Sequence, residues 1–412
     1  MAQINITLNQ DEILQLLSDN RDEAFKELLT ASLNSILKTE SREQLKAEPY
    51  ERTEERTDSR NGFRDRDLNT RIGTITLHVP RHRNQPFHTM IFDNYSRSET
   101  ALIAAMAEMV VNGVSTRKVS KVMETLCGTS YSKSAVSEVC RELDKEVEAF
   151  KNRPLTGKYP FLTVDATYFK VRENHRIISK AFMVAMATNE GGHPEVVGFG
   201  VYPRESKETW KDFMKSLCRR GLDGVLMITS DAHEGIRKAI TEVFPEVPWQ
   251  RCQFHFSRNI SDRAPKKVQA GLHTELQEMF NSQTIEEARR KRDEIIRDYQ
   301  DVAEKAMECL EEGFESSMTV LSLPKFIRTH YRTSNNVERL NRELKRRSDV
   351  TGVFPNEESM IRLMGSVLID LNEAEQKKRK KFGKETLKTL QSEQTIAILQ
   401  EIAEEQRRLM AA

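Results

Sequence analysis

The chain has no long apolar run, and this absence bounds what it can be. None of its 412 residues belong to an apolar stretch near the ~20 residues that a membrane-spanning helix needs. Its N-terminus, MAQINITLNQ, also has neither the basic nor the apolar region of a secretory signal. We therefore expect a cytoplasmic protein with no membrane partner.

Cysteine is scarce, and tryptophan occurs only twice. The number of cysteines is odd and their spacing is irregular, which argues against a disulfide framework and is typical of reduced thiols. The five are Cys127, Cys140, Cys218, Cys252 and Cys309. We expect them to be free.

The chain also has almost no net charge. Lys and Arg number 64 against 63 Asp and Glu, which gives +1, although charged residues make up 31% of the sequence. The total therefore neither favours nor excludes a nucleic-acid partner, and the distribution of charge must decide. The length is enough for two or three domains.

Three acidic residues stand in distinctive contexts. Asp165 lies inside an apolar run, FLTVDATYFK at 161–170, and Asp231 closes a second run, GVLMITSD at 224–231. Glu338 opens a basic helical segment, SNNVERLNRELKRR at 334–347. A carboxylate in or beside a buried strand is costly unless it is paired. Converging carboxylates without a basic partner predict a divalent-metal site, and two-metal sites of this kind catalyse phosphodiester chemistry.

The middle of the chain alternates strands and helices in a recognisable order. Apolar runs and polar turns predict strands at 161–170, 177–187, 195–202 and 224–230, helices at 206–220 and 234–244, and a short strand running through 249–256. This is the order of a ribonuclease H-like α/β sheet. In that sheet the first strand carries an acid near its middle, and the adjacent fourth strand carries one at its end.

The rest of the second half is predicted to be helical. Residues 260–325 are rich in Lys, Glu and Met and separate the second acid from the third, which indicates an all-helical insertion. Helices at 334–347 and 357–374 follow, and 375–412 is predicted to be one charged helix with a basic cluster at 377–381.

Arginines gather in a predicted hairpin near the N-terminus. The alternation of Ile72, Ile75, Leu77 and Val79 predicts the hairpin. Before it, residues 10–40 are predicted to form an amphipathic helix, for which a helical hairpin or a dimerisation element is the plain interpretation. Arginine suits planar contacts with phosphate, so we expect the arginine-rich hairpin to contact DNA, although a solvated hairpin is the plain alternative. The expected DNA-contact residues are Arg60, Arg64, Arg71, Arg81 and Arg83.

Helices at 98–112, 115–126 and 132–146 have the lengths of a helix-turn-helix unit, although any helical hairpin can look similar. Ser132 is the expected N-cap of the last helix, and Lys133, Ser137 and Arg141 are expected to face DNA. The segments expected in order are a helical region 1–58, the basic hairpin 59–95, the helix-turn-helix 96–150, the core in two parts 155–260 and 328–375, the insertion 261–327 and a charged helix 376–412.

Five ordered segments together resemble a known family. They are TVDATY at 163–168, ESKETW at 205–210, RRGLDGVLMITSDAHEGI at 219–236, WQRCQFHFSRN at 249–259 and TSNNVERLNRELKRR at 333–347. With the arginine-rich stretch at 60–83, the likeness covers roughly 60–375. The chain resembles bacterial insertion-sequence transposases of the Mutator-like family, which are DDE enzymes. That family often has Thr-Asn-Ala-Ile-Glu or Thr-Asn-Pro-Ile-Glu where this chain has SNNVE, and the acid itself is kept.

The resemblance implies that Asp165, Asp231 and Glu338 hold two Mg²⁺ or Mn²⁺ ions. It also implies a DNA transposase that binds terminal inverted repeats, cleaves the 3′ ends of the element and joins them to target DNA as a homodimer, on the bacterial nucleoid. Arg342, Lys345 and Arg346 then belong to a helix laid beside DNA. A nuclease without strand transfer and a DNA-binding regulator with a degenerate nuclease fold are the alternatives.

Each of these residues also has a plainer interpretation. Asp231 is a plausible cap for the following helix, and Glu338 stands three residues after Asn335, the spacing of a capping box. Glu343 is the nearest alternative acid. Cys252 and His255 have the spacing of two zinc ligands, but no second pair follows at zinc-finger spacing, so a structural role near the site is favoured.

Both tryptophans are expected in the core. Stacking of Trp210 or Trp249 on an unpaired base is the alternative.

Overall fold

The computed structural model describes residues 21–51, 53, 56–70, 73–89, 100–111, 114–127 and 131–411. The chain is a mixed α/β protein that divides into two compact units, Met1–Glu142 and Leu143–Ala412. None of the helices in these described ranges is long and apolar enough to cross a membrane.

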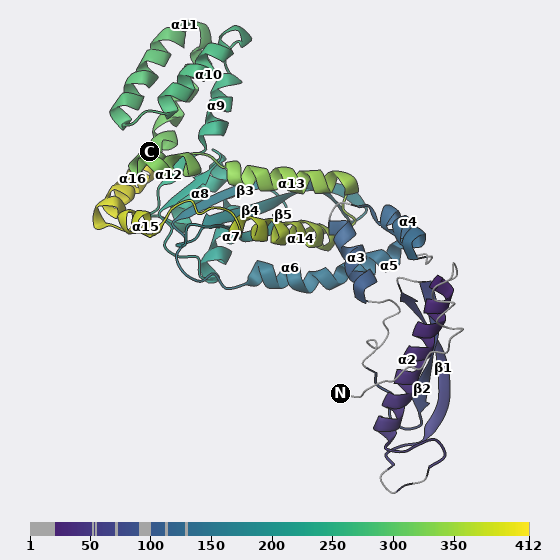
Figure 1. Cartoon of the computed structure of the whole chain (residues 1–412). Helices are drawn as coiled ribbons and strands as arrows, with labels where there is room; N and C mark the ends of the chain where they lie inside the picture. Colours follow the sequence, from purple (N-terminus) through teal and green to yellow (C-terminus); the bar gives the residue numbers. More distant parts are fainter. Residues whose placement is uncertain are drawn as a thin grey trace. The chain divides into compact units, whose positions relative to one another are not determined.

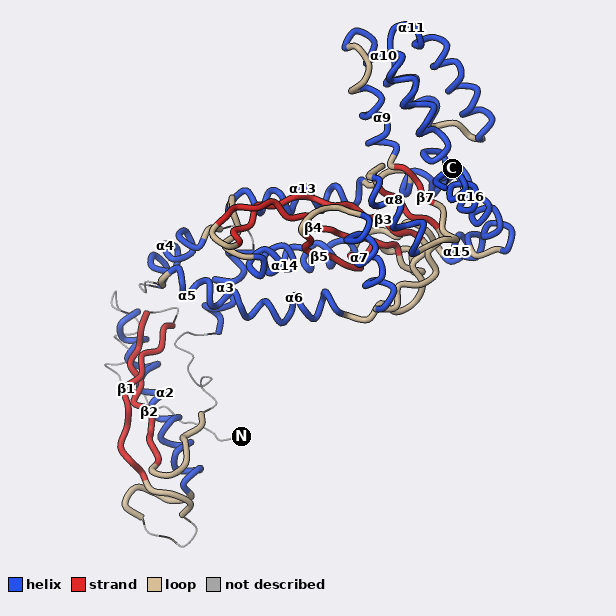
Figure 2. The backbone as a smooth tube through the Cα atoms, turned by 180° about the vertical axis from the view of Figure 1, so that it is seen from behind, coloured by secondary structure: helices blue, strands red, loops and turns tan. Residues whose placement is uncertain are grey.

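In the first unit, a helix packs on a two-stranded hairpin. Helix α2 (Arg21–Leu45) runs alongside β1 (Arg60–Thr70) and β2 (Gly73–His82), as Figures 1 and 2 both show. The strands are antiparallel, with Leu68 opposite Ile75. The predicted alternation is confirmed at Ile75, Leu77 and Val79, which are buried against Leu37 of α2; Ile72 lies outside the described residues.

A carboxylate closes the loop after this hairpin. Asp58 accepts hydrogen bonds from the backbone N–H groups of Gln85 (2.8 Å), Asn84 (2.8 Å) and Ser59 (2.6 Å), and from the Asn84 amide (2.9 Å). These bonds, that of Gln85 first, lower the pKa of Asp58 to about 2. Since each bond needs an acceptor, the ionised form holds the loop in place.

Three further helices of the first unit share a small core. Helices α3 (Thr100–Val111), α4 (Thr116–Cys127) and α5 (Lys133–Val139) bury Met106, Val119, Met123, Tyr131 and Val136. Ser132 caps α5 as predicted, because its hydroxyl accepts the Ala135 N–H at 3.0 Å. The prediction of one continuous helix at 132–146 is wrong. A 3₁₀ turn, η1 (Cys140–Glu142), interrupts it with Cys140 buried, and α6 (Leu143–Asn152) opens the second unit.

A five-stranded sheet forms the centre of the second unit. Its strands are β3 (Phe161–Glu173), β4 (Arg176–Thr188), β5 (Pro194–Tyr202), β6 (Met227–Ser230) and β7 (Trp249–Arg251), in the spatial order β5-β4-β3-β6-β7. Strands β3, β4 and β5 pair antiparallel, whereas β6 and β7 run parallel to β3. Helices α7 (Lys207–Arg219) and α8 (Glu234–Val243) pack on each other, and their apolar faces close the core against the sheet.

The last strand is shorter than predicted. It ends at Arg251, and α9 (Gln253–Ser261) starts directly afterwards with Cys252 as its N-cap residue. The prediction of a strand through 249–256 is therefore wrong beyond Arg251. Phe256 explains the change, because its backbone N–H bonds the Cys252 carbonyl and its ring is buried in the helical cluster that follows.

Helices α9, α10 (Lys266–Phe280) and α11 (Ile285–Met318) form a cluster with its own core, including Leu276, Ile295, Leu310 and Phe314 (Figure 1). This cluster occupies the predicted all-helical stretch. A 3₁₀ turn, η2 (Thr319–Ser322), and α12 (Lys325–Tyr331) lead back to the sheet.

The remaining helices pack on the sheet and along both of its edge strands. Helix α13 (Asn335–Thr351) packs across β3 and β4, and α14 (Glu357–Gln376) packs against β5. At the opposite edge, α16 (Glu393–Ala411) places the Gln406 amide on the backbone of β7. That amide accepts the Trp249 N–H at 2.8 Å and donates to the Trp249 carbonyl at 2.9 Å. A side chain thus satisfies backbone groups of an edge strand.

The prediction of one helix over 375–412 is wrong. Helix α14 ends at Gln376, and the chain then forms two separate helices, α15 (Lys384–Leu390) and α16. The break lets Phe382 reach the core, where its ring packs against Phe161 at 6.0 Å between centroids. The Lys381 N–H also bonds the Gly192 carbonyl at 2.8 Å, which fixes the turn.

The Asp58 contacts predict acid sensitivity of the hairpin. Because the folded pKa of about 2 lies below the ordinary aspartate value of about 3.9, the stabilisation is complete above about pH 4 and is lost as the pH falls through about 2. Hydrogen exchange of β1 and β2 should be faster in Asp58→Asn than in wild type at about pH 6, and the difference should shrink below about pH 3. Asp67→Asn is the control, because that carboxylate is exposed and accepts from the Thr76 hydroxyl on the neighbouring strand. Equal exchange in wild type and Asp58→Asn at about pH 6 would contradict the prediction.

Candidate active site

Two of the predicted acids lie side by side on neighbouring parallel strands. Thr163 of β3 pairs with Thr229 of β6, and Asp165 and Asp231 each follow their paired threonine by two residues. The strand geometry therefore places both carboxylates at one position of the sheet, where β6 has just ended. Burial first, and then the charge of Asp231, raise the pKa of Asp165 to about 7. Such a shift shows two partly buried acids close enough to repel.

The third acid is brought to this position by α13. The Asn341 amide donates to Oδ2 of Asp165 at 2.7 Å, while the Ala166 N–H donates to Oδ1 at 2.9 Å. Glu338 precedes Asn341 by three residues and so lies on the same face of the helix. The hydrogen bond from Asn341 to the sheet therefore also fixes the position of Glu338.

Glu338 is held by the N-cap residue of its own helix and by the start of α9. Its Oε1 accepts from the Ser334 hydroxyl at 2.7 Å and lies 3.7 Å from His255 Nε2 and 3.9 Å from Cys252 Sγ. The capping-box interpretation is wrong, because Ser334 is the N-cap residue and makes no side-chain cap hydrogen bond. Its hydroxyl turns to the Glu338 carboxylate instead.

His255 is a basic partner that the sequence argument did not include. The sulfur of Cys252 first, and then the charges of Glu338 and Asp165, raise the pKa of His255 to about 9, against the opposing effect of burial. The imidazole therefore keeps its proton at neutral pH and partly offsets the negative charge around it. The assumption that the acids converge without a basic partner is wrong.

Possible metal ligands converge differently from the prediction. In the part of the chain that the structure describes, the one set of three ligand atoms within 4.8 Å of one another belongs to Cys252, His255 and Glu338. The three acids do not form such a set there. The spacing of Cys252 and His255 was visible in the sequence, but its third member comes from a helix far along the chain.

A fourth acid lies beside Asp231. Burial first raises the pKa of Glu205; Asp231 also raises it, while His233 has the opposite effect. The Glu205 carboxylate accepts from the Trp210 indole at 3.4 Å. Both residues lie in the ESKETW motif, which is the signal that could have identified this acid.

Neither tryptophan is available for stacking. Trp210 is fully buried, and Trp249 is 7% exposed with its indole donating to the Ser230 hydroxyl at 2.9 Å. The core interpretation of both is confirmed. An exposed aromatic ring beside the site is Phe254, which is 51% exposed and lies next to His255.

The expected DNA-contact residues differ in how available they are. The Arg60 guanidinium bonds the backbone carbonyls of Ala47 and Glu48, so it braces the first unit. Arg64 and Arg81 line a groove of about 780 Å³ along the hairpin. The other exposed members are Arg83, Ser137, Arg141, Arg342, Lys345 and Arg346. Arg71 and the side chain of Lys133 lie outside the described residues.

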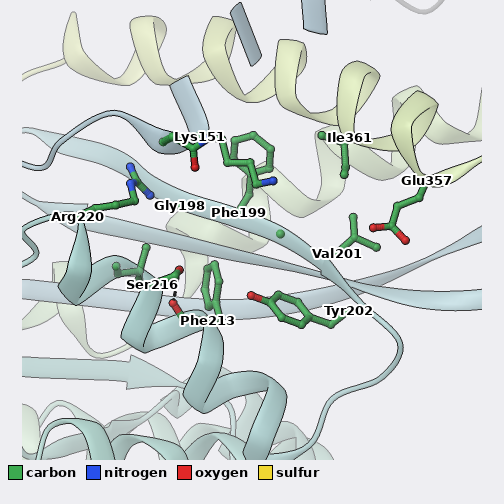
Figure 3. Close-up of a pocket in the computed structure, with 13 residues that line it drawn as sticks. Lys151, Gly198, Phe199, Val201, Tyr202, Phe213, Ser216, Arg220, Glu357 and Ile361 are labelled. Carbon is green, nitrogen blue, oxygen red and sulfur yellow. Dashed lines mark hydrogen bonds between the residues drawn. The ribbon is translucent and has the colours of Figure 1, made fainter. Parts of the chain in front are cut away.

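A separate cavity of about 240 Å³ lies beside the edge strand β5 (Figure 3). Phe213 and Ser216 of α7, Arg220, and Glu357 of α14 surround it. Asp165 pairs with Val184, and Val184 pairs with Phe199 at the cavity, so β4 separates the two places. None of the three predicted acids lines the cavity.

The raised pKa of Asp165 predicts how metal binding at this carboxylate would depend on pH. A carboxylate must lose its proton to bind a cation, so any Mn²⁺ affinity that depends on Asp165 should fall about tenfold per pH unit below about pH 7. Electron paramagnetic resonance of free Mn²⁺ measures this. Asp165→Asn should lose the dependence, whereas Glu343→Gln should keep it, because Glu343 is paired with Arg346 and Arg347. Equal wild-type affinity at about pH 6 and about pH 8 would exclude Asp165 as the controlling group.

Comparison with known proteins addresses the family. The sequence model of the family described as "Transposase, Mutator family" matches residues 1–378. The transposase for insertion sequence element IS256 in transposon Tn4001 of Staphylococcus aureus is 40% identical over 377 residues, covering 90% of this chain and 96% of the relative. The transposase for ISRM5 of Rhizobium meliloti is 37% identical over 361 residues, covering 88% and 90%.

A mycobacterial relative extends the same likeness. The transposase for IS1081 of Mycobacterium tuberculosis is 35% identical over 379 residues, covering 90% of this chain and 91% of the relative. Matches of this identity run through both structural units and include every segment of the candidate site. The chain therefore belongs to the Mutator family of transposases.

Proposed function

We propose that the chain is a DNA transposase that binds the terminal inverted repeats of a mobile element, hydrolyses the phosphodiester at its 3′ ends and joins the freed 3′-OH to target DNA. One observation carries this proposal. Asp165 and Asp231 lie together on parallel strands, and Asn341 holds the helix of Glu338 over them. The relatives named as insertion-sequence transposases support it.

The sheet supports a ribonuclease H-like core. Three antiparallel strands followed by two that run parallel to the first, in the order β5-β4-β3-β6-β7, have the arrangement expected of that fold. The helical cluster α9–α11 then stands as an insertion between Asp231 and Glu338. In the same proposal, α3–α5 form a helix-turn-helix unit that reads DNA.

Two Mg²⁺ or Mn²⁺ ions fit the donor chemistry of the three acids. Their ligand atoms are all carboxylate oxygens, which these hard cations prefer. Burial first, and then repulsion from Asp231, raise the pKa of Asp165 to about 7, and a nearby dication favours the ionised carboxylate. When bound, such ions lower the pKa of a water and stabilise the leaving oxygen.

The residues around the acids have positioning tasks. Asn341 and the Ala166 N–H orient the two oxygens of Asp165, and Ser334 orients Oε1 of Glu338. His255 holds a proton facing Glu338 and so limits the charge that accumulates before DNA arrives. Buried carboxylates with fixed partners need less reorganisation when the substrate binds.

DNA contact is proposed for the hairpin groove and for the outer face of α13. Arg64 and Arg81 line the groove, and Arg342 and Lys345 are exposed on the helix that carries Glu338. The two ends of an element must be joined in one event, so we propose a homodimer with one set of acids per protomer. A nuclease without strand transfer is the second candidate, and the same assay separates the two by its joined product.

Removing any one acid should abolish the chemistry and spare DNA binding. Asp165→Asn, Asp231→Asn and Glu338→Gln should each lower end cleavage and strand transfer by more than about 100-fold, since even a lost outer partner of a metal ligand costs about 10–100-fold. Binding to the end should stay within about twofold, because recognition lies elsewhere. A labelled element end incubated with Mg²⁺ reports both cleavage and joining.

Glu343→Gln is the matched control for Glu338→Gln. It removes a carboxylate from the same helix that is paired with Arg346 and Arg347, so wild-type activity is expected. Cleavage by Glu338→Gln at the wild-type rate would show that another residue is the third acid. Cleavage by wild type without any joined product would favour the nuclease.

The groove arginines should set the salt dependence of binding. Each phosphate contact contributes about 0.9 to the slope of log affinity against log salt. Arg64→Ala and Arg81→Ala should therefore each reduce the slope for end DNA by about 0.9 in fluorescence anisotropy with the full chain. Arg289→Ala, which breaks an exposed pair with Glu315 on α11, is the control and should leave it unchanged. An unaltered slope in both groove variants would remove the hairpin from the DNA-contact surface.

A further inference from the structure

Three ligand types meet where the sheet, α9 and α13 join. Cys252 follows β7, His255 lies in the first turn of α9, and Glu338 lies in the first turn of α13. Their Sγ, Nε2 and Oε1 atoms all lie within 4.8 Å of one another. Cys252 is fully buried, whereas the side chains of His255 and Glu338 are 28% and 20% exposed. The cluster thus has a closed sulfur side and a side open to solvent.

The spacing matches tetrahedral coordination of a zinc-sized ion. Zinc lies about 2.3 Å from sulfur and about 2.0–2.2 Å from nitrogen and oxygen, so its tetrahedral ligands stand about 3.3–3.8 Å apart. The carboxylate oxygen lies 3.7 Å from the imidazole nitrogen and 3.9 Å from the sulfur. Shifts of a few tenths of an ångström along these two edges reach that geometry. Among the described residues the other ring nitrogen of His255 is buried without a hydrogen-bond partner, so Nε2 is the atom that would bind a metal, in place of the proton that it carries in the metal-free protein.

Two helix N-termini meet at the sulfur of Cys252. The Ser334 N–H lies 3.3 Å from Sγ and donates to it, and the Ser334 hydroxyl, which donates to Oε1 of Glu338, lies 3.2 Å from the same sulfur. Cys252 is the N-cap residue of α9, and Ser334 is the N-cap residue of α13, so the positive ends of two helices lie at one sulfur. A thiolate is the form of cysteine that binds metal.

We propose that Cys252, His255 and Glu338 form a binding site for a soft divalent cation of the zinc class, with three protein ligands and a fourth position open. The mixed sulfur, nitrogen and oxygen set distinguishes it from the all-carboxylate set proposed for Mg²⁺ or Mn²⁺. An ion here ties together the end of β7, the first helix of the α9–α11 cluster and the helix that carries Glu338. The site is argued from its own geometry and shares Glu338 with the carboxylate set of the catalytic proposal, so its test reads the thiolate and not DNA cleavage.

Cobalt(II) tests the site directly, because it occupies zinc sites and its bond to a thiolate gives an intense charge-transfer absorption. Metal-free, reduced full-length protein titrated with Co²⁺ should develop this band and saturate at one ion per chain. Zn²⁺ should then displace the cobalt and abolish the band, since zinc binds more tightly in the order of divalent metals. A wild-type protein without a thiolate band overturns the proposal.

Ligand variants locate the band. Cys252→Ser should remove it, and His255→Gln should weaken Co²⁺ affinity by more than about 100-fold, since loss of an outer partner alone costs about 10–100-fold. Circular dichroism verifies that each variant is folded. Because His255 is partly exposed, His255→Gln still tests the site by its Co²⁺ affinity if Cys252→Ser does not fold. A wild-type band and affinity in His255→Gln would overturn the site.

Two control variants separate this site from others. Cys218→Ser removes an exposed thiol from α7 and should keep the band, so a band lost in this variant would place the metal elsewhere and overturn the proposal. Asp165→Asn should also keep it, even though the same variant is expected to lose DNA cleavage. A band lost in Asp165→Asn would mean that the sulfur shares the carboxylate site, which overturns a separate zinc-class site.

Discussion

The hydrogen bond from Asn341 to Asp165 joins segments 176 residues apart, and the candidate active site depends on it. Asp165 is positioned by β3 and Asp231 by the neighbouring parallel strand, but neither strand carries the third acid. Helix α13 could lie across the sheet in several registers. The amide of Asn341, which reaches one carboxylate oxygen at 2.7 Å, selects the register that places Glu338 one helical turn away and on the same face.

The electrostatics of the site follow from this arrangement. Burial first, and then repulsion from the neighbouring Asp231 carboxylate, raise the pKa of Asp165. The imidazole of His255, with its pKa raised to about 9, offsets part of the charge. Folding therefore brings like charges together, and a bound cation would reduce the repulsion between them. The Cys252 sulfur and Ser334 on the other side of Glu338 show that one carboxylate is shared between two polar clusters.

Much of the fold could be predicted because local patterns were strong. Continuous apolar runs predicted β3, β4 and β5, and the N-cap preference of Ser132 predicted the start of α5. Predictions were wrong where a distant partner decided the outcome. The strand after Trp249 gave way to α9 because Phe256 is buried among the helices, and the C-terminal helix broke so that Phe382 could pack on Phe161. The capping box at Glu338 was wrong because Ser334 bonds the carboxylate rather than the helix backbone.

The sequence by itself determined the order of the strands and helices from β3 to α8, the burial of both tryptophans, and the place of Asp165, Asp231 and Glu338 in three distinct motifs. These depend on apolar periodicity and on short motifs, which are local properties. Only the tertiary structure decided that Asn341 orients Asp165, that His255 is a basic partner, and that Glu338 completes a cluster with Cys252. Those relations are distances between segments remote in sequence, and such distances exist only once the sheet and the helices have packed.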